Sequence, residues 1–215
     1  MPRPKKCRRI CALPRCSSFG PLEGAADGRV EMAVEEYEAI RLIDLLGCTQ
    51  EECAAQMGVA RSTVQQVYDT ARRRLAQALV EDGMTLGMLG FVTLSVPEEL
   101  LVSLEERFLA EGHPRDLNVF YTSAIGDGGE HGANHLAHVG LVRRMVGAHV
   151  GLAPKLNPLI TGNQIETFCA PQGVLVHMCR AMAGHKCGVI THVGLKTFCD
   201  PEVEACCFND AARKA

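Results

Sequence analysis

The chain has 215 residues, of which 47% are hydrophobic and 22% are charged, so it can bury the core of one large domain or of two small ones. Its longest uncharged stretch, residues 84–97, is too short and too rich in glycine and threonine to span a bilayer. The N-terminus also lacks the apolar region of a signal peptide. We therefore expect a cytoplasmic protein with no membrane partner, whose eleven cysteines stay reduced.

The net charge of -3 hides an uneven distribution along the chain. Residues 1–15 contain six Lys or Arg and no acid, whereas all eight histidines follow residue 112. A basic N-terminus of this kind is a candidate anion-binding arm. Two chemically different halves are expected, beginning with an extended, surface-lying arm over residues 1–30.

Residues 34–47 have the apolar spacing of an amphipathic helix. Val34, Tyr37, Ile40 and Ile43 share one helical face, and Gly47 is a natural stop. Three leucines widen this face: Leu42, Leu45 and Leu46. We expect this face to be buried.

A second helix should begin at Thr49, because Thr49 followed by Glu52 forms a capping box. Gly58 permits a left-handed turn, and a third helix starts near Arg61. The pattern predicts a helix-turn-helix within a DNA-binding domain over residues 31–80, although an ordinary helical hairpin with a solvated charged face has the same spacing.

In a helix-turn-helix, side chains near the start of the second helix reach base edges, and later basic side chains reach phosphates. The candidates for base contacts are Arg61, Ser62, Thr63, Gln65 and Gln66. The candidates for phosphate contacts are Arg72, Arg73 and Arg74, together with Lys5, Lys6, Arg8 and Arg9 of the arm. Cys7, Cys11 and Cys16 are candidate metal or cluster ligands, but their spacing is irregular for zinc and no fourth ligand is near.

Five segments of the first 80 residues resemble a family of small uncharacterised prokaryotic proteins with a helix-turn-helix similar to region 4 of sigma factors. These segments are "MPRPKKCRR", "FGPLEG", "EEYEAIRLIDL", "TQEECAAQMGVARSTVQ" and "ARRRLAQALV". The resemblance implies a DNA-binding role in transcription regulation.

The pattern after Gly83 changes toward alternating strands and helices. "MTLGML" is typical of a buried strand, "PEELLVSLEERFLAEG" of a helix that Gly112 ends, and "LNVFYTSA" of a second strand before a glycine-rich loop. "ANHLAHVGLVRRMVGAH" is interpreted as a further helix, and "IETFCAP", "GVLVHMCRAMAGH" and "KCGVITHVGL" continue the alternation. The expected class is therefore α plus α/β, with the α/β domain over residues 81–205 and a tail over 206–215.

Ordered blocks of this half resemble the N-terminal half of family I coenzyme A transferases, the acetate, propionate and 3-oxoacid type. The blocks are "GFV…PEELL", "GHPRDL", "GDGGEHGANHLAHVGLVRRMVGAHVGLAPKL", "IETFCAPQGVLVHMCR" and "GVITHVGLKTFCDPEVE". The resemblance implies a partial Rossmann-like, doubly wound domain that contributes to an acyl-CoA site. Family members transfer CoA through a glutamate nucleophile, which the other half of the transferase supplies. We therefore name no catalytic residue in this chain.

The resemblance identifies residues 90–95 as the loop whose backbone amides approach the developing oxyanion: Gly90, Phe91, Val92, Thr93 and Ser95. Thr93 and Ser95 stand where the family usually has glycines, so the close backbone approach is expected to be impaired. The candidate pocket residues are Gly126, Asp127, Asn134, Gln172 and Gly173, while Asn134, Gln172 and His177 are equally candidates for buried hydrogen bonding. Glu166 lies outside the nucleophile motif.

His131, His135 and His138 are spaced for a zinc site on one helix, but Gly132 lies between the first two, so core or turn histidines are favoured and no metal is expected. Three functions remain open. In the first, the chain is a DNA-binding protein whose second domain senses acyl-CoA or mediates association as a homo-oligomer. In the second, it is a component of a transferase that another chain completes. In the third, it is a fusion remnant without catalysis. No cofactor is required, and a CoA thioester is the candidate ligand or substrate. "ARRRLAQALVEDG" fits both resemblances, so the halves are expected to share this helix.

Overall fold

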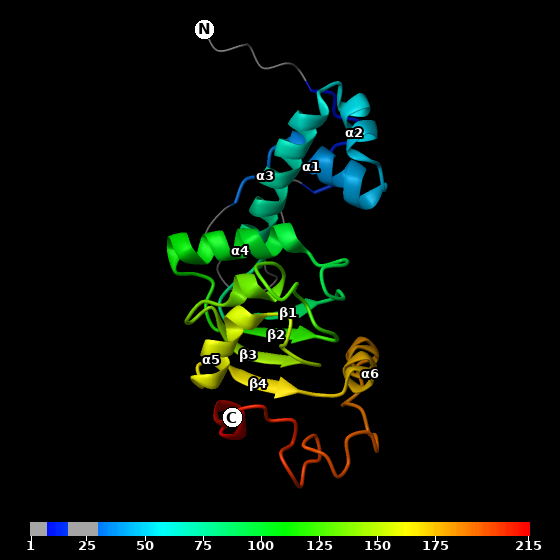
Figure 1. Ribbon diagram of the computed structural model, residues 1–215. Helices are drawn as coiled ribbons and strands as arrows, with labels where there is room; N and C mark the ends of the chain where they lie inside the picture. The colour runs from blue at the N-terminus through cyan, green and yellow to red at the C-terminus, as the bar shows by residue number, and fades with distance from the viewer. Residues whose placement is uncertain (1–7, 17–29) are drawn as a thin grey trace. The chain divides into compact units, whose positions relative to one another are not determined.

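The computed structural model describes residues 8–16 and 30–215. The chain divides into two compact units, residues 1–79 and residues 80–215, which are described separately below (Figure 1). Within the described ranges, no helix is long and apolar enough to cross a membrane.

The first unit is helical. Helix α1 covers Val34–Ile40 and continues directly into a π-helical segment, Arg41–Leu45. Helix α2 covers Gln50–Met57, and α3 covers Arg61–Leu79. The core of the unit consists of side chains from all of these elements, among them Ala39, Leu42, Cys53, Ala54, Met57, Val64, Val67 and Tyr68.

The start and end of α2 confirm the expected signals. The Thr49 hydroxyl accepts a hydrogen bond from the Glu52 amide at 3.2 Å, and the Glu52 carboxylate accepts one from the Thr49 amide at 2.8 Å. Gly58 ends α2 with φ 68°. A side chain rarely adopts this left-handed backbone conformation, which explains the glycine.

The apolar face expected over residues 34–47 is buried only in part: Leu42 is fully buried, whereas other residues of this face are exposed. Glu36 and Glu38 are buried, whereas Val34 and Leu45 are 44% and 75% exposed. The Glu38 carboxylate is neutralised by two hydrogen bonds from Arg41, both 2.8 Å long, so it can occupy the interior. The π-helical segment also changes the angle between successive residues after Ile40, which turns Leu45 and Leu46 outward.

The described part of the N-terminal arm has neither helix nor strand, as expected, but it is fastened to the helices. The Arg9 amide donates to the Met57 carbonyl at 3.0 Å, and the Cys11 amide donates to the Glu38 carboxylate at 2.9 Å. Lys5, Lys6 and Cys7 lie outside the described residues.

The second unit contains a parallel four-stranded sheet. Its strands are β1 (Thr85–Met88), β2 (Leu117–Tyr121), β3 (Val142–Gly147) and β4 (Glu166–Cys169), and they lie side by side in chain order (Figure 1). The helical first unit and this parallel sheet confirm the expected class, α plus α/β. The reversal of strand order that defines a doubly wound sheet does not occur among the four strands described.

Helices and short helical turns connect the strands. Helix α4 (Glu98–Glu111) joins β1 to β2 and ends at Gly112, as expected. The remaining elements are η2 (Ala133–Leu136), η3 (Pro154–Leu156), α5 (Asn157–Thr161), α6 (Gln172–Ala183) and α7 (Asp210–Arg213).

Three expectations about this unit are wrong. Residues 133–149 do not form one helix, because Gly140, with φ 86°, separates the short turn η2 from strand β3. β1 is not fully buried, since it lies at the edge of the sheet and Thr85 and Gly87 are exposed. Residues 186–195 contain no strand; Ile190 is fully exposed, so this segment lacks the packing that would hold a strand.

One face of the sheet forms the core. Leu117, Val119 and Tyr121 of β2 and Met145 of β3 are almost completely buried there, together with Leu101 of α4. Residues on the opposite face of β2 and β4 are only half-buried. The two faces therefore have different environments.

Residues 206–215, which the sequence sets apart as a tail, contact the outer edge of β4. The Cys169 amide donates to the Cys206 carbonyl at 2.9 Å, and the Phe208 amide donates to the Thr167 carbonyl at 2.8 Å. The buried Asn209 side chain donates to the Ile165 carbonyl at 2.8 Å. These bonds occupy backbone groups of an edge strand that would otherwise have no partner.

Candidate functional site

The N-terminal part of α3 has one buried and one exposed face. Val64 and Val67 pack in the same core cluster as Ala54 and Met57 of α2. The opposite face exposes Arg61, Ser62, Gln65 and Gln66, with Thr63 half-buried beside them. Four of the five residues expected to contact base edges therefore point into solvent.

Arg61 has a partner on the neighbouring helix. Its Nε lies 2.8 Å from a Glu51 oxygen, and both side chains are more than 60% exposed. Exposed ion pairs of this kind contribute little to stability. Arg61 can therefore leave Glu51 for an external anion at small cost.

The three consecutive arginines of α3 have different surroundings. Arg74 donates to the Glu31 carbonyl at 2.7 Å and to the buried Glu36 carboxylate at 2.8 Å. The Arg72 guanidinium lies 4.6 Å from the centre of the Tyr68 ring, and Arg73 is exposed. Arg74 thus holds the unit together, while Arg73 is directed outward.

The described arm residues that are expected to contact phosphates also differ in their surroundings. Arg8 forms an ion pair with Glu35 of α1, and the Arg9 side chain lies against Gly58 at the turn between α2 and α3. Cys11 and Cys16 are exposed free cysteines. The structure thus brings Arg9 close to the turn that precedes the exposed face of α3.

The second candidate site lies at the carboxyl ends of the strands, where parallel α/β sheets usually bind ligands. Residues 89–97, between β1 and α4, contact the loop that follows β2. The Val92 amide donates to the Ala124 carbonyl at 3.0 Å, and the Gly126 amide donates to the Val92 carbonyl at 2.8 Å. The expected oxyanion loop and the glycine-rich loop therefore lie side by side.

Residues in the oxyanion loop adopt unusual backbone angles. Val92 and Ser95 both have φ 59°, a left-handed conformation that favours glycine, whereas Thr93 does not share it. A Cβ atom on Gly90 would lie 2.8 Å from the Val96 side chain. Of the two positions where glycine is expected from the resemblance, only Ser95 has a backbone conformation that favours glycine.

Gly126 and Asn134 fasten the glycine-rich loop. A Cβ atom on Gly126 would lie 2.2 Å from the Leu152 carbonyl oxygen. Asn134 is 1% exposed; its side chain donates to the His131 carbonyl at 2.8 Å and accepts from the Lys155 amide at 3.2 Å. Asn134 is therefore a buried hydrogen-bonding residue.

The remaining pocket candidates are exposed. Asp127 accepts a hydrogen bond from the side chain of His131, and then one from the Gly129 amide; these bonds hold its pKa far below the usual value. Gln172 and Gly173 are exposed at the start of α6. His177 is exposed as well, which contradicts its interpretation as a buried group.

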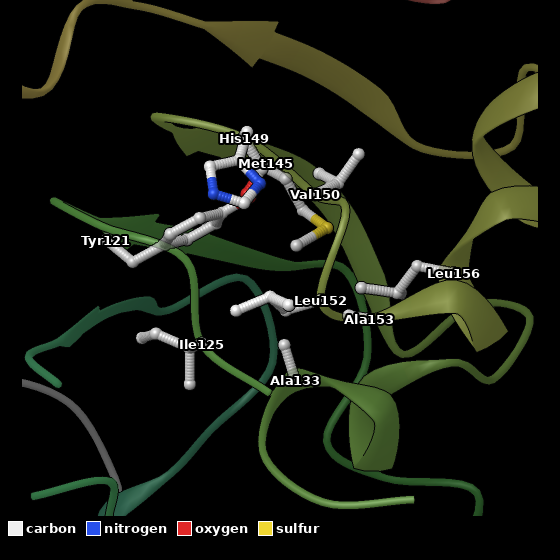
Figure 2. A pocket seen from close by; sticks show the side chains of 9 residues that line it. All are labelled: Tyr121, Ile125, Ala133, Met145, His149, Val150, Leu152, Ala153 and Leu156. Atoms are coloured by element: carbon white, nitrogen blue, oxygen red, sulfur yellow. The ribbon is translucent and has the colours of Figure 1, made fainter. Parts of the chain in front are cut away.

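A small cavity of about 10 Å³ lies between the sheet and the segment after β3 (Figure 2). Tyr121 and His149 line it, and the Tyr121 hydroxyl lies 3.3 Å from the His149 carbonyl oxygen. Burial raises the pKa of Tyr121 above its ordinary range. The cavity can hold no more than one water molecule, so it is a packing defect of the core and not an acyl pocket.

The three histidines that are spaced for a zinc site each pair with a carboxylate and not with one another. His135 bridges Glu105, 2.5 Å away, and Glu98, 2.8 Å away; His138 lies 2.6 Å from the other oxygen of Glu105. Burial opposes the charged form of His135, but the hydrogen bonds to both glutamates raise its pKa. Within residues 8–16 and 30–215, no cluster of His, Cys, Asp or Glu has the arrangement of a metal site.

Sequence reasoning missed the carboxylates of α4. Glu98 connects this helix to the glycine-rich loop, because it accepts hydrogen bonds from the Gly132 amide at 2.9 Å and from His135. Glu166, by contrast, pairs with Arg144 at the amino end of β4, away from the loops at the carboxyl ends. The spacing of Glu98 and Glu105, two helical turns apart, was the available signal.

Comparison with known families agrees with these two units. Residues 68–212 match the family described as "Coenzyme A transferase", and residues 1–90 match the one described as "Protein of unknown function DUF134". The fold thus defines a helical unit fused to a parallel α/β unit of the transferase class. The chain belongs to the coenzyme A transferase family and carries a DUF134 region at its N-terminus. The two matches overlap at residues 68–90, which include the last part of α3 and all of β1.

Curated relatives match each part separately. Caffeate CoA-transferase of Acetobacterium woodii is 40% identical over 129 residues, which are 60% of this chain and 25% of that protein. A UPF0251 protein of Desulfitobacterium hafniense is 58% identical over 82 residues, 37% of this chain and 66% of that protein. The chain therefore spans a quarter of the length of the transferase and about two thirds of the smaller relative.

Solved structures resemble the second part of the chain. The acyl-CoA transferase YdiF from Escherichia coli O157:H7 has a TM-score of 0.62 and 29% identity as the apoenzyme, covering 65% of this chain and 27% of that one. Its thioester complex with CoA gives a TM-score of 0.63 at the same identity and coverage. The parallel sheet described above is thus shared with a CoA-binding enzyme.

Proposed function

We propose that the first unit is a DNA-binding helix-turn-helix, similar to region 4 of sigma factors, and that the chain acts in transcription regulation. The exposed polar start of α3 carries this proposal. Val64 and Val67 hold α3 against α2, while Arg61, Ser62 and Gln65 extend outward from the first turns. This is the placement from which side chains reach base edges in a major groove.

The proposal assigns different roles to the basic residues. Arg73, exposed on α3, and Arg9, beside the Gly58 turn, contact phosphates, together with Lys5 and Lys6 of the arm. Arg74 supports the domain through its ion pair with the buried Glu36 carboxylate. An ordinary helical hairpin would share the packing but would not bind DNA.

Binding to a duplex of random sequence tests this function. We expect fluorescence anisotropy to show an affinity that falls at least about tenfold between about 50 mM and about 200 mM salt, because phosphate contacts release counterions. Arg73→Ala should reduce the slope of the logarithm of the binding constant against the logarithm of the salt concentration by about one. Arg180→Ala, an exposed arginine of α6, is the matched control and should leave the slope unchanged. Absence of binding at low salt excludes the regulatory function.

A second candidate function is supported by the contact between the two loops at the carboxyl ends of β1 and β2. We propose that residues 89–97 and Gly126 form part of an acyl-CoA site, as a sensor of CoA thioesters or as a component of a CoA-transferase. In the second case a glutamate from outside residues 80–215, on a complementing segment or chain, is the nucleophile. Self-association of the chain is a further part of this proposal.

Acetyl-CoA titration of the full chain and two glycine variants tests the loop assignment. Ser95→Gly removes a side chain from a left-handed backbone, so we expect it to stabilise the unit by about 1 kcal/mol and to bind acetyl-CoA at least as tightly. Thr93 does not have a left-handed backbone, so Thr93→Gly relieves no strain. It should lower the stability of the unit, because glycine increases the conformational entropy of the unfolded chain. If calorimetry detects no acetyl-CoA binding by the parent chain or by either variant, this second function is excluded.

A further inference from the structure

The half-buried face of the sheet carries two rows of side chains that cross the strands in register. Strand pairing aligns the first row, which is polar: Thr85, Asn118, Arg144 and Glu166. It also aligns the second row, which is mainly apolar: Gly87, Phe120, Val146 and Phe168. Both faces of a parallel sheet are normally covered. A polar row that contains an arginine is therefore unusual in this position.

A β-bulge adds a second arginine to this face. Leu117 pairs with Val142, but the next residue, Asn118, pairs with Arg144, so Arg143 is an extra residue in β3. Consecutive residues of a regular strand point to opposite faces, and a bulge changes the direction of a side chain. As a result, Arg143 and Arg144 line the same groove.

The groove has a volume of about 310 Å³, at the lower end of the range for small-molecule sites. Its walls include Thr85, Asn118 and Phe120 in addition to the two arginines. The Arg143 guanidinium lies 3.5 Å from the Asn118 side-chain oxygen, a distance at which a hydrogen bond is weak. Hydrogen-bond donors and an aromatic surface thus meet in one recess.

The charge of the groove is unbalanced. The Arg144 Nε lies 2.5 Å from a Glu166 oxygen, while Arg143 is exposed to solvent. The Glu166 carboxylate thus pairs with Arg144, whereas the Arg143 guanidinium makes a weak contact with Asn118. The groove is lined by residues of β1, β2 and β3 and includes Thr85 at the amino end of β1, whereas the loops proposed for acyl-CoA follow the carboxyl ends of β1 and β2.

We propose that this groove binds the phosphate group of a small phosphorylated molecule, held by Arg143 and Arg144. Paired guanidinium groups match the geometry and charge of a phosphate, which accepts several charge-assisted hydrogen bonds. Phe120 and Val146 supply an apolar surface for the rest of the ligand. The proposal is independent of DNA binding and of acyl-CoA transfer.

Calorimetric titration of the full chain with ADP and with inorganic pyrophosphate tests the proposal. We expect both probes to bind, and Arg143→Ala to weaken each at least about tenfold, the effect of losing a charge-assisted hydrogen bond. Arg180→Ala is the matched control, because it removes an exposed arginine of the same unit outside the groove. Equal affinities of these two variants, or absence of binding to the parent chain, would overturn the proposal.

Glu166→Gln provides a test with the opposite sign. Removing the carboxylate frees Arg144 from competition, so we expect ADP and pyrophosphate to bind more tightly, by at least about threefold. A variant that merely unfolded would lose affinity instead, and a thermal unfolding transition close to that of the parent chain confirms that it is folded. Unchanged or weaker binding by this folded variant contradicts the assignment of the phosphate to Arg144.

Discussion

Replacing Glu38 by glutamine is expected to lower the free energy of unfolding of the helical unit by about 3 kcal/mol at pH 7. The Glu38 side chain is fully buried; hydrogen bonds from Arg41, followed by the Cys11 amide, outweigh its burial and lower its pKa to about 2. A difference of about two and a half pKa units from its ordinary value corresponds to this energy. The variant also leaves the Arg41 guanidinium, which is 14% exposed, without a carboxylate.

The same contact predicts a specific dependence on pH. Because the folded-state pKa of Glu38 is lowered, its contribution is complete above the ordinary value of 4.5 and is lost as the pH falls toward about 2. Urea unfolding at several pH values should therefore show the variant and the parent chain converging in acid. Hydrogen exchange by mass spectrometry assigns the transition to residues 30–79.

Glu35→Gln is the matched control on the same helix. The Glu35 side chain is 39% exposed and pairs with Arg8 at the surface, so its loss should cost no more than about 1 kcal/mol. If Glu38→Gln and Glu35→Gln were equally stable at pH 7, the buried ion pair would not contribute as proposed.

Gly126→Ala is expected to destabilise the second unit by at least about 3 kcal/mol. The new methyl group would lie 2.2 Å from the Leu152 carbonyl oxygen, and φ at this position is 148°, so both backbone segments would have to move. This movement breaks the hydrogen bond from the Gly126 amide to the Val92 carbonyl and separates the two loops. Thermal unfolding measures the first effect, and acetyl-CoA titration measures the second.

Gly173→Ala separates this steric effect from the general effect of adding a methyl group. Gly173 lies in the first turn of α6, and nothing occupies the space that its Cβ atom would fill. Alanine favours a helix over glycine, so the stability should be unchanged or up to about 1 kcal/mol higher. Similar losses for the two alanine variants would show that the Leu152 contact is not decisive.

Local signals in the sequence predicted much of the fold. The capping box at Thr49 and the stops at Gly58 and Gly112 depend on residues that are adjacent in the chain, and the structure has all of them. Ordered family motifs likewise indicated a parallel α/β unit after the helical one. Both kinds of signal are local or sequential, so they are readable without knowing which distant segments meet.

The misassigned elements depend on distant partners. The residues of β3 were expected to be helical because the apolar residues in "GLVRRMVG" fit the period of a helix as well as that of a strand. Pairing with both β2 and β4 decides in favour of the strand. The burial of Glu38 requires Arg41 and the backbone of Cys11, 27 residues away in the chain. The groove beside Arg143 similarly depends on a bulge that only the register with β2 reveals.

The contact of residues 206–208 with β4 affects how the protein behaves at high concentration. An open parallel sheet can recruit a strand from another molecule at either side, which is a route to aggregation. On the β4 side, hydrogen bonds through Cys206 and Phe208 block this recruitment. Only β1, four residues long and interrupted by Gly87, remains at the other edge of the described sheet. The protein thus shields one border of its sheet with its own chain and keeps the other too short to serve as an efficient template.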